Sequence, residues 1–341
     1  MRSDPTRQAA VLGAGSWGTA LAIHLGNEGH DVALWGRDPA LLDAMIARRC
    51  NPTYLPDIQL PAPVRLALSL EDALAGACYV VVAVPSHGLR AVVRAAAPHI
   101  ERDAILVSAT KGFETDTLQR MSEVITGETH GKHPVVVLSG PSFAMEVARR
   151  LPTALVAAST DREAVPSVQH EFRGRALRVY GSDDVVGVEV GAALKNTIAI
   201  AAGVVESLHL GHNALSALIT RGLAEISRLA CAMGGRRETL AGLSGLGDLV
   251  LTCTGSLSRN RRVGLELGQG RTLDEILSGT KMVAEGVRTT TAALSLGERH
   301  QVELPIAAQM AEVLAGQKTA RDAVGHLMLR PQRDEADVQA V

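Results

Sequence analysis

The sequence predicts an α/β domain followed by an all-α domain. Short apolar runs alternate with longer helix-like segments from Ala9 to about Tyr180, as they do around a parallel sheet. After about Gly187 strand-like runs become rare, and long segments rich in Ala, Leu and Gly with helical spacing take over. The length of 341 residues also suits about two domains of ordinary size. We therefore divide the chain into residues 1–186 and 187–341.

Apolar runs in the first half have the length and composition of strands. Those at 80–84 and 135–138 carry almost no polar side chain, as expected of strands that helices cover on both faces. In chain order the predicted strands are 9–12, 31–35, 79–84, 105–108, 135–138, 153–158 and 177–180. In the second half, the segments with helical spacing are 188–207, 213–233, 272–278, 287–299 and 305–315.

Composition and charge exclude several classes of function. Lysine plus arginine (34) nearly balance aspartate plus glutamate (36), so no global basic field exists to bind nucleic acid or an anionic membrane. No uninterrupted apolar run approaches the roughly 20 residues that a membrane-spanning helix needs, so we expect no membrane insertion. Four separated cysteines show no metal-ligand spacing, and we expect no metal site. The polar N-terminus lacks the features of a secretory signal, which makes the cytoplasm the expected location.

A glycine-rich turn lies between the first predicted strand and an amphipathic helix. Gly13, Gly15 and Gly18 form a GxGxxG pattern within AAVLGAGSWGTALA. The first glycine permits the tight turn, the second lets backbone N–H groups approach a pyrophosphate, and the third lets helix and strand pack closely. The helix dipole favours an anion at that end. In this setting the pattern predicts a Rossmann-type doubly wound parallel sheet that binds a dinucleotide.

The end of the second predicted strand bears on the kind of dinucleotide. The position where an acidic side chain would bind a ribose 2′-hydroxyl holds Gly36, and Arg37 follows it. Arg37 favours a 2′-phosphate, and hence NADP(H). Arg37 could instead be an ordinary solvated cation and Asp38 could still reach the ribose, so use of NAD(H), of NADP(H) or of both stays open.

Two charged residues stand alone in apolar surroundings. Lys195 is the only ionisable residue of 190–205, on a predicted helix that is apolar nearly all round. Burial would lower its pKa towards the range useful for acid–base work on a carbonyl or an alcohol, whereas a surface position would leave it an ordinary lysine. Asp248 is the only charged residue of 239–258. It is either a cap or turn residue or an orienting partner of Lys195.

Arginines cluster at the start of another predicted helix. Arg259, Arg261 and Arg262 follow Ser258 in SRNRRVG, although the helix dipole disfavours cations at that end. The cluster makes sense if an anion such as a phosphate binds there, but a solvated basic face would give the same pattern. Further candidates follow predicted strand ends, where open α/β sheets place ligands: Lys111, Gly140, Ser142 and Ala144.

Seven segments resemble, in order, the bacterial NAD(P)-dependent glycerol-3-phosphate dehydrogenase family: GAGSWGTALA, NPTYLP, SATKGFE, LSGPSFAMEV, GAALKNTIAIAAG, GLGDLVLTC and SRNRRVG. The match extends from about Ala9 to His326. It implies a Rossmann domain followed by a helical domain, a homodimer, and reduction of dihydroxyacetone phosphate to sn-glycerol 3-phosphate for phospholipid synthesis. Two alternatives are a dehydrogenase of the same plan acting on a β-hydroxy acid and a non-catalytic dinucleotide sensor.

The resemblance also implies roles for particular residues. Lys195 is the family's proton donor and acceptor, and we expect Asp248 to orient it while Lys111 adds positive potential. The implied substrate contacts are Lys111, Gly140, Ser142, Lys195, Asp248, Ser258, Arg259 and Asn260. The expected nucleotide contacts are Gly13, Gly15, Ser16, Trp17, Gly18, Arg37, Tyr54, Lys111, Ala144, Arg259, Val283 and Glu285.

Overall fold

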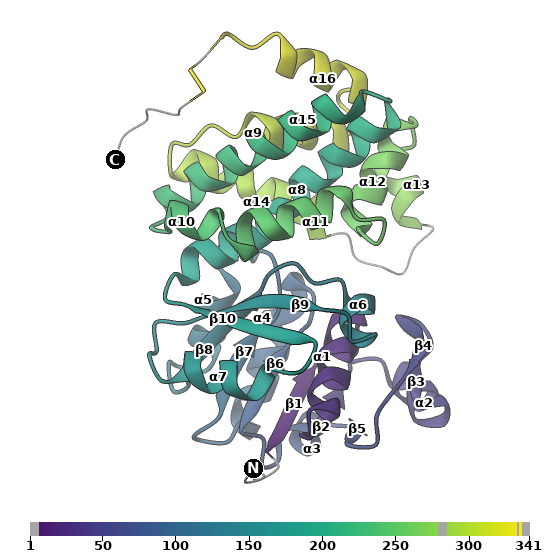
Figure 1. The fold of residues 1–341 in the computed structure, drawn as a ribbon, viewed down its shortest axis with the longest axis vertical. Helices are drawn as coiled ribbons and strands as arrows, with labels where there is room; N and C mark the ends of the chain where they lie inside the picture. Colours follow the sequence, from purple (N-terminus) through teal and green to yellow (C-terminus); the bar gives the residue numbers. More distant parts are fainter. Residues whose placement is uncertain (1–6, 279–284, 333, 336–341) are drawn as a thin grey trace.

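The computed structural model describes residues 7–278, 285–332, 334 and 335, which form two parts stacked along the long axis of the molecule (Figure 1). The strands lie in the lower part, in purple to teal, and the later helices form the upper part, in green to yellow (Figure 1). Helix α8 (Val185–Ser207) leads from one part into the other. The predicted order, α/β followed by all-α, is confirmed.

The strands of the lower part are β1 (Gln8–Leu12), β2 (Asp31–Trp35), β3 (Cys50–Asn51), β4 (Leu55–Gln59), β5 (Val64–Ala67), β6 (Tyr79–Val82), β7 (Ile105–Ser108), β8 (Val135–Ser139), β9 (Thr153–Ala158) and β10 (Leu177–Ser182). Its helices are α1 (Ser16–Asn27), α2 (Pro39–Arg48), α3 (Leu70–Leu74), α4 (Ser86–Ala96), α5 (Met121–Glu128), α6 (Ala144–Ala148) and α7 (Ala164–Phe172), with a 3₁₀ turn η1 (Ala97–His99). Every predicted strand is present; β3, β4 and β5 were not predicted.

The main sheet has the strand order β10-β9-β8-β7-β6-β1-β2-β5. Strand β1 pairs in parallel with both β2 and β6, so the order reverses between β1 and β6, the point at which open α/β sheets bind ligands. One pairing refines the expectation of a parallel sheet, because β8 and β9 are antiparallel. The connection between them, 140–152, contains only the five-residue helix α6, which is too little for the crossover that a parallel pair needs.

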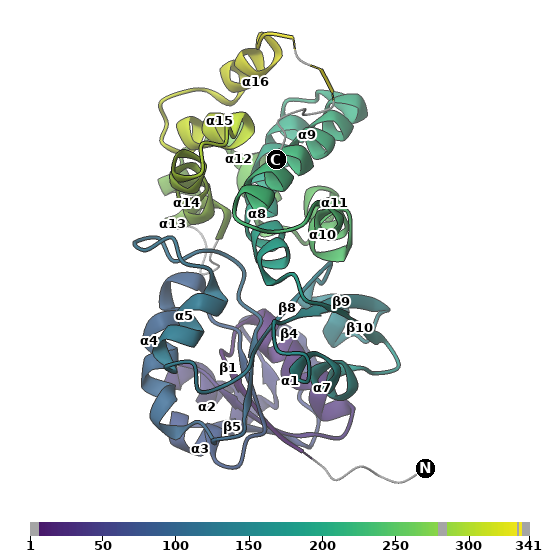
Figure 2. The same cartoon turned by 90° about the vertical axis from the view of Figure 1, so that its left-hand side faces the viewer.

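Helices cover both faces of the sheet. Val11 and Val81 belong to the core beneath α1 and α7, whereas Ala10 and Val80 belong to the core beneath α3, α4 and α5. Figure 2 shows these helices on opposite sides of the strands. Because successive strand residues point to opposite faces and both faces are buried at the centre of the sheet, strand β6 (YVVV) is apolar throughout. Burying each such valine stabilises the fold by about 1.5–3 kcal/mol relative to exposure.

The upper part consists of α8, α9 (Gly211–Ala232), α10 (Arg237–Leu240), a π-helical turn η2 (Leu243–Gly247), α11 (Asp248–Thr254), α12 (Arg259–Gly268), α13 (Leu273–Ser278), α14 (Glu285–Arg299), α15 (Pro305–Leu314) and α16 (Ala320–Met328). The predicted helices are confirmed with small shifts of their ends; α10, η2, α11 and α16 were not predicted. Helix α8 is buried from Gly187 to Val205. Of single helices among the described residues, α8 alone is apolar and long enough to span a membrane, but 89% of its most apolar window is buried inside the protein.

Glycines let α12 approach the backbone of α8 closely. A Cβ at Gly264 would lie 1.8 Å from the carbonyl oxygen of Ile200, and one at Gly203 would lie 2.0 Å from that of Arg261. Real Cβ atoms do not approach so near, so neither position accepts a side chain without a shift of one helix. This packing places the first residues of α12 relative to the middle of α8.

Candidate active site

The glycine turn sits between β1 and α1, beside β6. Gly13 has φ +125°, and a Cβ there would lie 2.4 Å from the carbonyl oxygen of Ala83; a Cβ at Gly18 would lie 1.9 Å from that of Gly13. Both positions therefore require glycine for the protein's own packing. At Gly15 no atom of the residues that the structure describes lies within 4 Å of the corresponding point, so this glycine leaves open space in front of α1.

The same turn carries unused hydrogen-bond donors. In the described part of the chain no side chain caps the N-terminus of α1, which leaves the first backbone N–H groups of the helix for an anion. The indole Nε1 of Trp17 is buried without a hydrogen-bond partner among the described residues. Open space, free helix donors and a favourable dipole fit the pyrophosphate of a dinucleotide.

A hairpin that the sequence did not reveal braces this turn. Asn51, on β3, is fully buried and donates from Nδ2 to the carbonyl oxygen of Ala14 at 2.9 Å and to Thr19 Oγ1 at 2.8 Å. The backbone N–H of Tyr54 donates to Asn51 Oδ1 at 3.0 Å. Half-buried Tyr54, expected to contact the nucleotide, is thus held on the segment that supports the turn.

Two residues that follow β2, Arg37 and Asp38, differ in their contacts. Asp38 caps α2, because its Oδ1 accepts hydrogen bonds from the backbone N–H groups of Ala40 at 3.1 Å and Leu41 at 3.4 Å. Arg37 is exposed. The cap engages only Oδ1 of Asp38, so it does not decide between Asp38 and Arg37 as the residue that faces this end of a nucleotide.

Lys195, Asp248 and Lys111 meet where the two parts of the molecule join. Lys195 Nζ donates to Asp248 Oδ1 at 2.6 Å and to Thr252 Oγ1 at 2.7 Å. Lys111 Nζ donates to the other carboxylate oxygen, Oδ2, at 2.7 Å and to the carbonyl oxygen of Gly140 at 3.1 Å. The Lys195 and Asp248 side chains are 8% and 1% exposed. Of the two positions considered for Lys195, the buried one is therefore confirmed.

The surroundings of Lys195 determine its proton affinity. Burial lowers the pKa of Lys195 to about 8; the carboxylate of Asp248 opposes this lowering, and the ammonium of Lys111 adds to it. Cys253 also faces the amine, and burial raises the pKa of its thiol to about 12, which keeps the thiol neutral. Both protonation states of Lys195 are thus accessible near neutral pH, as acid–base work requires.

The π-helical turn η2 and helix α11 position Asp248. A Cβ at Gly191, one turn before Lys195 on α8, would lie 2.8 Å from the carbonyl oxygen of Ser244, so η2 packs directly on α8. Thr252 Oγ1 donates to the carbonyl oxygen of Asp248 at 2.6 Å. Sequence reasoning missed Thr252; its position four residues after Asp248, on one face of a helix, is the signal that was available.

The three arginines at the start of α12, expected to bind an anion, have different partners. Arg261 pairs with Glu206, and Arg262 pairs with Glu266 at 3.2 Å. Only Arg259 reaches across to the glycine turn, where its guanidinium donates to Ser16 Oγ. Neighbouring acidic side chains, which the spacing of the arginines does not reveal, form ion pairs with the other two.

Most of the remaining candidates lie close to this junction. Buried Ser258 caps α12 by accepting from the backbone N–H of Arg261 at 3.2 Å. Asn260 Nδ2 donates to Asn196 Oδ1 at 3.0 Å, and Asn260 Oδ1 accepts from the backbone N–H of Gly286 at 3.0 Å. Among the described residues the second amide N–H of Asn260 has no partner, so it suits a ligand.

Three more expected contacts come from either side of the junction, and one cannot be placed. Ser142 Oγ donates to the carbonyl oxygen of Gly140 at 3.0 Å, and Ala144 is the first residue of α6. Glu285, at the start of α14, accepts from Ser86 Oγ at 2.8 Å. Val283 lies outside the described residues.

Fold and site together define a class of protein: a nicotinamide-dinucleotide-dependent dehydrogenase with a Rossmann-type sheet and a helical part that supplies a buried lysine. Family models narrow this class. The model for the N-terminus of NAD-dependent glycerol-3-phosphate dehydrogenase matches residues 8–165, and that for its C-terminus matches residues 184–325. The chain belongs to the NAD-dependent glycerol-3-phosphate dehydrogenase family, and it is an oxidoreductase that uses NAD(P)(H).

Individual relatives agree with this assignment. A glycerol-3-phosphate dehydrogenase [NAD(P)+] of Koribacter versatilis is 54% identical over 275 residues, which cover 80% of this chain and 82% of that protein. One from Thioalkalivibrio sulfidiphilus is 53% identical, with 79% and 81% covered. The crystal structure of glycerol-3-phosphate dehydrogenase from Coxiella burnetii superposes with a TM-score of 0.92 at 39% identity, covering 95% of this chain and 99% of that one. These matches favour the family over a β-hydroxy-acid dehydrogenase or a non-catalytic sensor.

Proposed function

We propose that the protein interconverts dihydroxyacetone phosphate and sn-glycerol 3-phosphate, with Lys195 as the acid and base. The observation that carries the proposal is the buried Lys195 amine, which lies 2.6 Å from Asp248 Oδ1 while Lys111 occupies the second carboxylate oxygen. The names of the relatives supply the substrate pair, and the lowered pKa of Lys195 suits proton transfer to and from the oxygen on C2.

In this proposal the nucleotide is held mainly by the lower part of the molecule. The glycine turn binds the pyrophosphate at the start of α1, and the further contacts are Ser16, Trp17, Arg37, Tyr54, Lys111, Ala144, Arg259, Val283 and Glu285. When bound, the nicotinamide supplies or takes the hydride at C2. We propose a preference for NADP(H), supported by exposed Arg37 after the end of β2.

The protein's own groups handle the proton and the charge. In reduction, protonated Lys195 donates to the alkoxide that develops at C2; in oxidation, neutral Lys195 removes the hydroxyl proton. Asp248 holds the amine in place, and Lys111 adds positive potential where the negative charge develops. The expected substrate contacts, Gly140, Ser142, Ser258, Arg259 and Asn260, would fix the phosphate end and so align C2.

The wider setting of the enzyme is part of the proposal. We place it in the cytoplasm, as a homodimer that produces sn-glycerol 3-phosphate for phospholipid synthesis. Residues 1–186 form the proposed nucleotide domain and residues 187–341 the proposed substrate domain. The start of α8 at Val185 lies close to this division.

The test compares Lys195→Met with the unchanged protein. Turnover is followed as NADPH and NADH oxidation with dihydroxyacetone phosphate, and nucleotide affinity is measured by fluorescence. We expect Lys195→Met to lower kcat by about 10³-fold, within the usual range for a general acid, with little change in NADPH affinity. The control is Lys318→Met, which removes a lysine that is paired with Glu312 instead.

A correctly folded Lys195→Met protein with near-normal turnover would refute the lysine assignment. The substrate assignment has its own check, unphosphorylated dihydroxyacetone. If the phosphate end aligns C2, removing it should lower kcat/KM by at least about 10²-fold. Equal activity with both compounds would contradict the proposal that the substrate phosphate aligns C2.

A further inference from the structure

The segment that follows Lys111 connects the two parts of the molecule. It belongs in sequence to the lower part, yet Phe113 is only 3% exposed and lies in the hydrophobic core of the upper part. Leu118 packs against the same core. Lys111 therefore stands at the start of a segment that is anchored in the helical part of the molecule.

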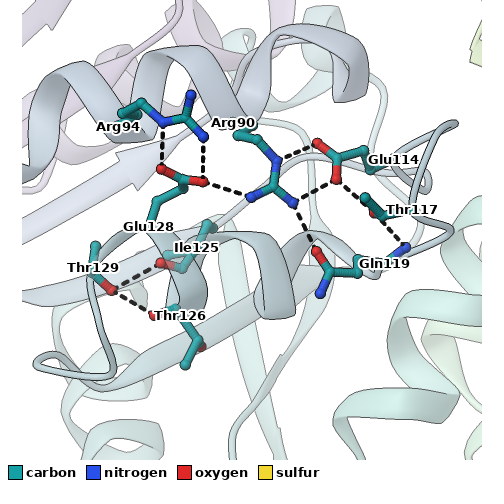
Figure 3. A network of polar contacts seen from close by, with 9 residues as sticks. All are labelled: Arg90, Arg94, Glu114, Thr117, Gln119, Ile125, Thr126, Glu128 and Thr129. Carbon is teal, nitrogen blue, oxygen red and sulfur yellow. Dashed lines mark hydrogen bonds and ion pairs between the residues drawn. The ribbon is translucent and has the colours of Figure 1, made fainter.

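A cluster around Arg90, on α4, anchors the same segment from the other side (Figure 3). Arg90 Nε donates to Glu114 Oε1 at 2.7 Å and Arg90 Nη2 to Glu114 Oε2 at 2.5 Å, a bidentate pair. Arg90 also donates to Gln119 Oε1 at 2.7 Å and to Glu128 Oε1 at 2.6 Å. The Arg90 and Glu114 side chains are only 29% and 15% exposed, so this pair is stronger than an open surface ion pair.

The distance along the chain from this cluster to Lys111 is short. Glu114 comes three residues after Lys111, and between them Gly112 has φ +140°. A Cβ at Gly112 would lie 3.0 Å from the Cβ of Ser86, so the turn rests on the first residue of α4. Ser86 and Arg90 lie one helical turn apart, and together they hold both ends of the turn that begins at Lys111.

We infer that Arg90 is a positioning residue for Lys111. The Lys111 amine must stay 2.7 Å from Asp248 Oδ2 at the end of a long, flexible side chain, and the Arg90–Glu114 pair fixes the backbone from which that side chain extends. A displacement of about 1 Å at a reacting group can lower turnover by about 10²-fold. The inference rests on the role proposed for Lys111.

The test uses four variants of the full-length enzyme: Arg90→Gln, Lys111→Met, their double variant, and the control Arg94→Gln. Arg94 suits the control because it lies one turn further along α4 and pairs with Glu128 rather than with the segment after Lys111. We expect Arg90→Gln to lower kcat for reduction by about tenfold and to change the KM for NADPH no more than Lys111→Met does. Arg94→Gln should leave both values unchanged.

Two further readouts distinguish an effect through Lys111 from a general loss of stability. In the double variant, Arg90→Gln should add less than about a twofold loss to Lys111→Met, because it acts through Lys111. Among the described residues, the titratable groups that act on the Lys195 amine are Asp248, Lys111 and Cys253. Displacing the Lys111 cation should therefore move the alkaline limb of kcat/KM for reduction to higher pH in Arg90→Gln, but not in Arg94→Gln.

The outcomes distinguish this inference from the function on which it rests. Wild-type turnover in Lys111→Met would overturn the proposed role of Lys111. If Lys111→Met is slow but Arg90→Gln behaves like Arg94→Gln, or if the two losses multiply in the double variant, the positioning role is wrong. Should Arg90→Gln unfold, Glu114→Gln replaces it, because Arg90 then keeps Glu128 as a partner.

Discussion

The glycine turn and the Lys195–Asp248 site differ in how far apart along the chain their parts lie. Gly13, Gly15 and Gly18 are close neighbours, and their geometry depends mainly on one strand, one helix and the adjacent backbone of Ala83. The acid–base site draws its residues from the loop after β7, the middle of α8 and the start of α11. A local motif can be disrupted by one added methyl group, whereas an assembled site depends on charges that compensate one another across the fold.

The largest expected effect tests that compensation. Asp248→Asn leaves two lysine amines facing a neutral amide in a buried place, so the pKa of Lys195 should fall further and the acid should be lost at neutral pH. We expect kcat/KM for reduction to fall by about 10³-fold and the free energy of unfolding by about 3 kcal/mol. Steady-state kinetics and urea unfolding check both, with exposed Asp274→Asn as the control. Unchanged values in both assays would contradict the central role of this carboxylate.

The glycine turn allows a matched pair of substitutions. Gly13→Ala combines a strained φ with a steric clash, so it should lower the free energy of unfolding by at least about 2 kcal/mol and also weaken nucleotide binding. Gly15→Ala adds its methyl group to open space, so stability should stay close to that of the unchanged protein while NADPH affinity falls by about tenfold, or about 1.4 kcal/mol. Thermal unfolding and nucleotide titration separate the two effects. Equal NADPH affinity in Gly15→Ala would mean that the pyrophosphate does not approach this residue.

The smallest expected effect concerns the choice of nucleotide. Arg37→Ala should lower the ratio of kcat/KM with NADPH to that with NADH by about tenfold, the worth of one hydrogen bond to a charged group. The assay is the same reduction with each nucleotide in turn, and exposed Arg48→Ala, on α2, is the control. An unchanged ratio would end the proposed preference for NADP(H).

Periodicity and motif together predicted much of this fold. Two-sided burial makes β6 apolar throughout and β8 apolar from Val135 to Leu138, and burial on all sides leaves Lys195 as the only ionisable residue of 190–205 in α8. Both patterns can be read from the chain because they report burial directly. The three short strands β3 to β5 escaped prediction because Pro, Asn and charged residues interrupt them, and β3 has only two residues. The antiparallel direction of β9 depends on how little chain connects it to β8, not on its own residues.

The acid–base site was only partly predictable. An isolated Lys195 and an isolated Asp248 were visible as candidates, but their 2.6 Å contact arises from the packing of η2 and α11 on α8. Thr252 looks like any threonine on a short helix until it is seen beside Lys195. The acidic partners of Arg261 and Arg262 likewise become evident only once the helices are placed. Contacts across the fold decide such cases, and no local pattern encodes them.

The most direct test of the account is the pH dependence of kcat/KM in both directions for the unchanged enzyme. The pKa of Lys195 is lowered to about 8, so the protonated acid is lost, and the neutral base gained, as the pH rises through that value. Reduction of dihydroxyacetone phosphate should therefore slow above about pH 8, while oxidation of sn-glycerol 3-phosphate accelerates over the same interval. Rates that change in the same direction, or no inflection between about pH 7 and pH 10 in either direction, would contradict the assignment of Lys195 as the acid and base.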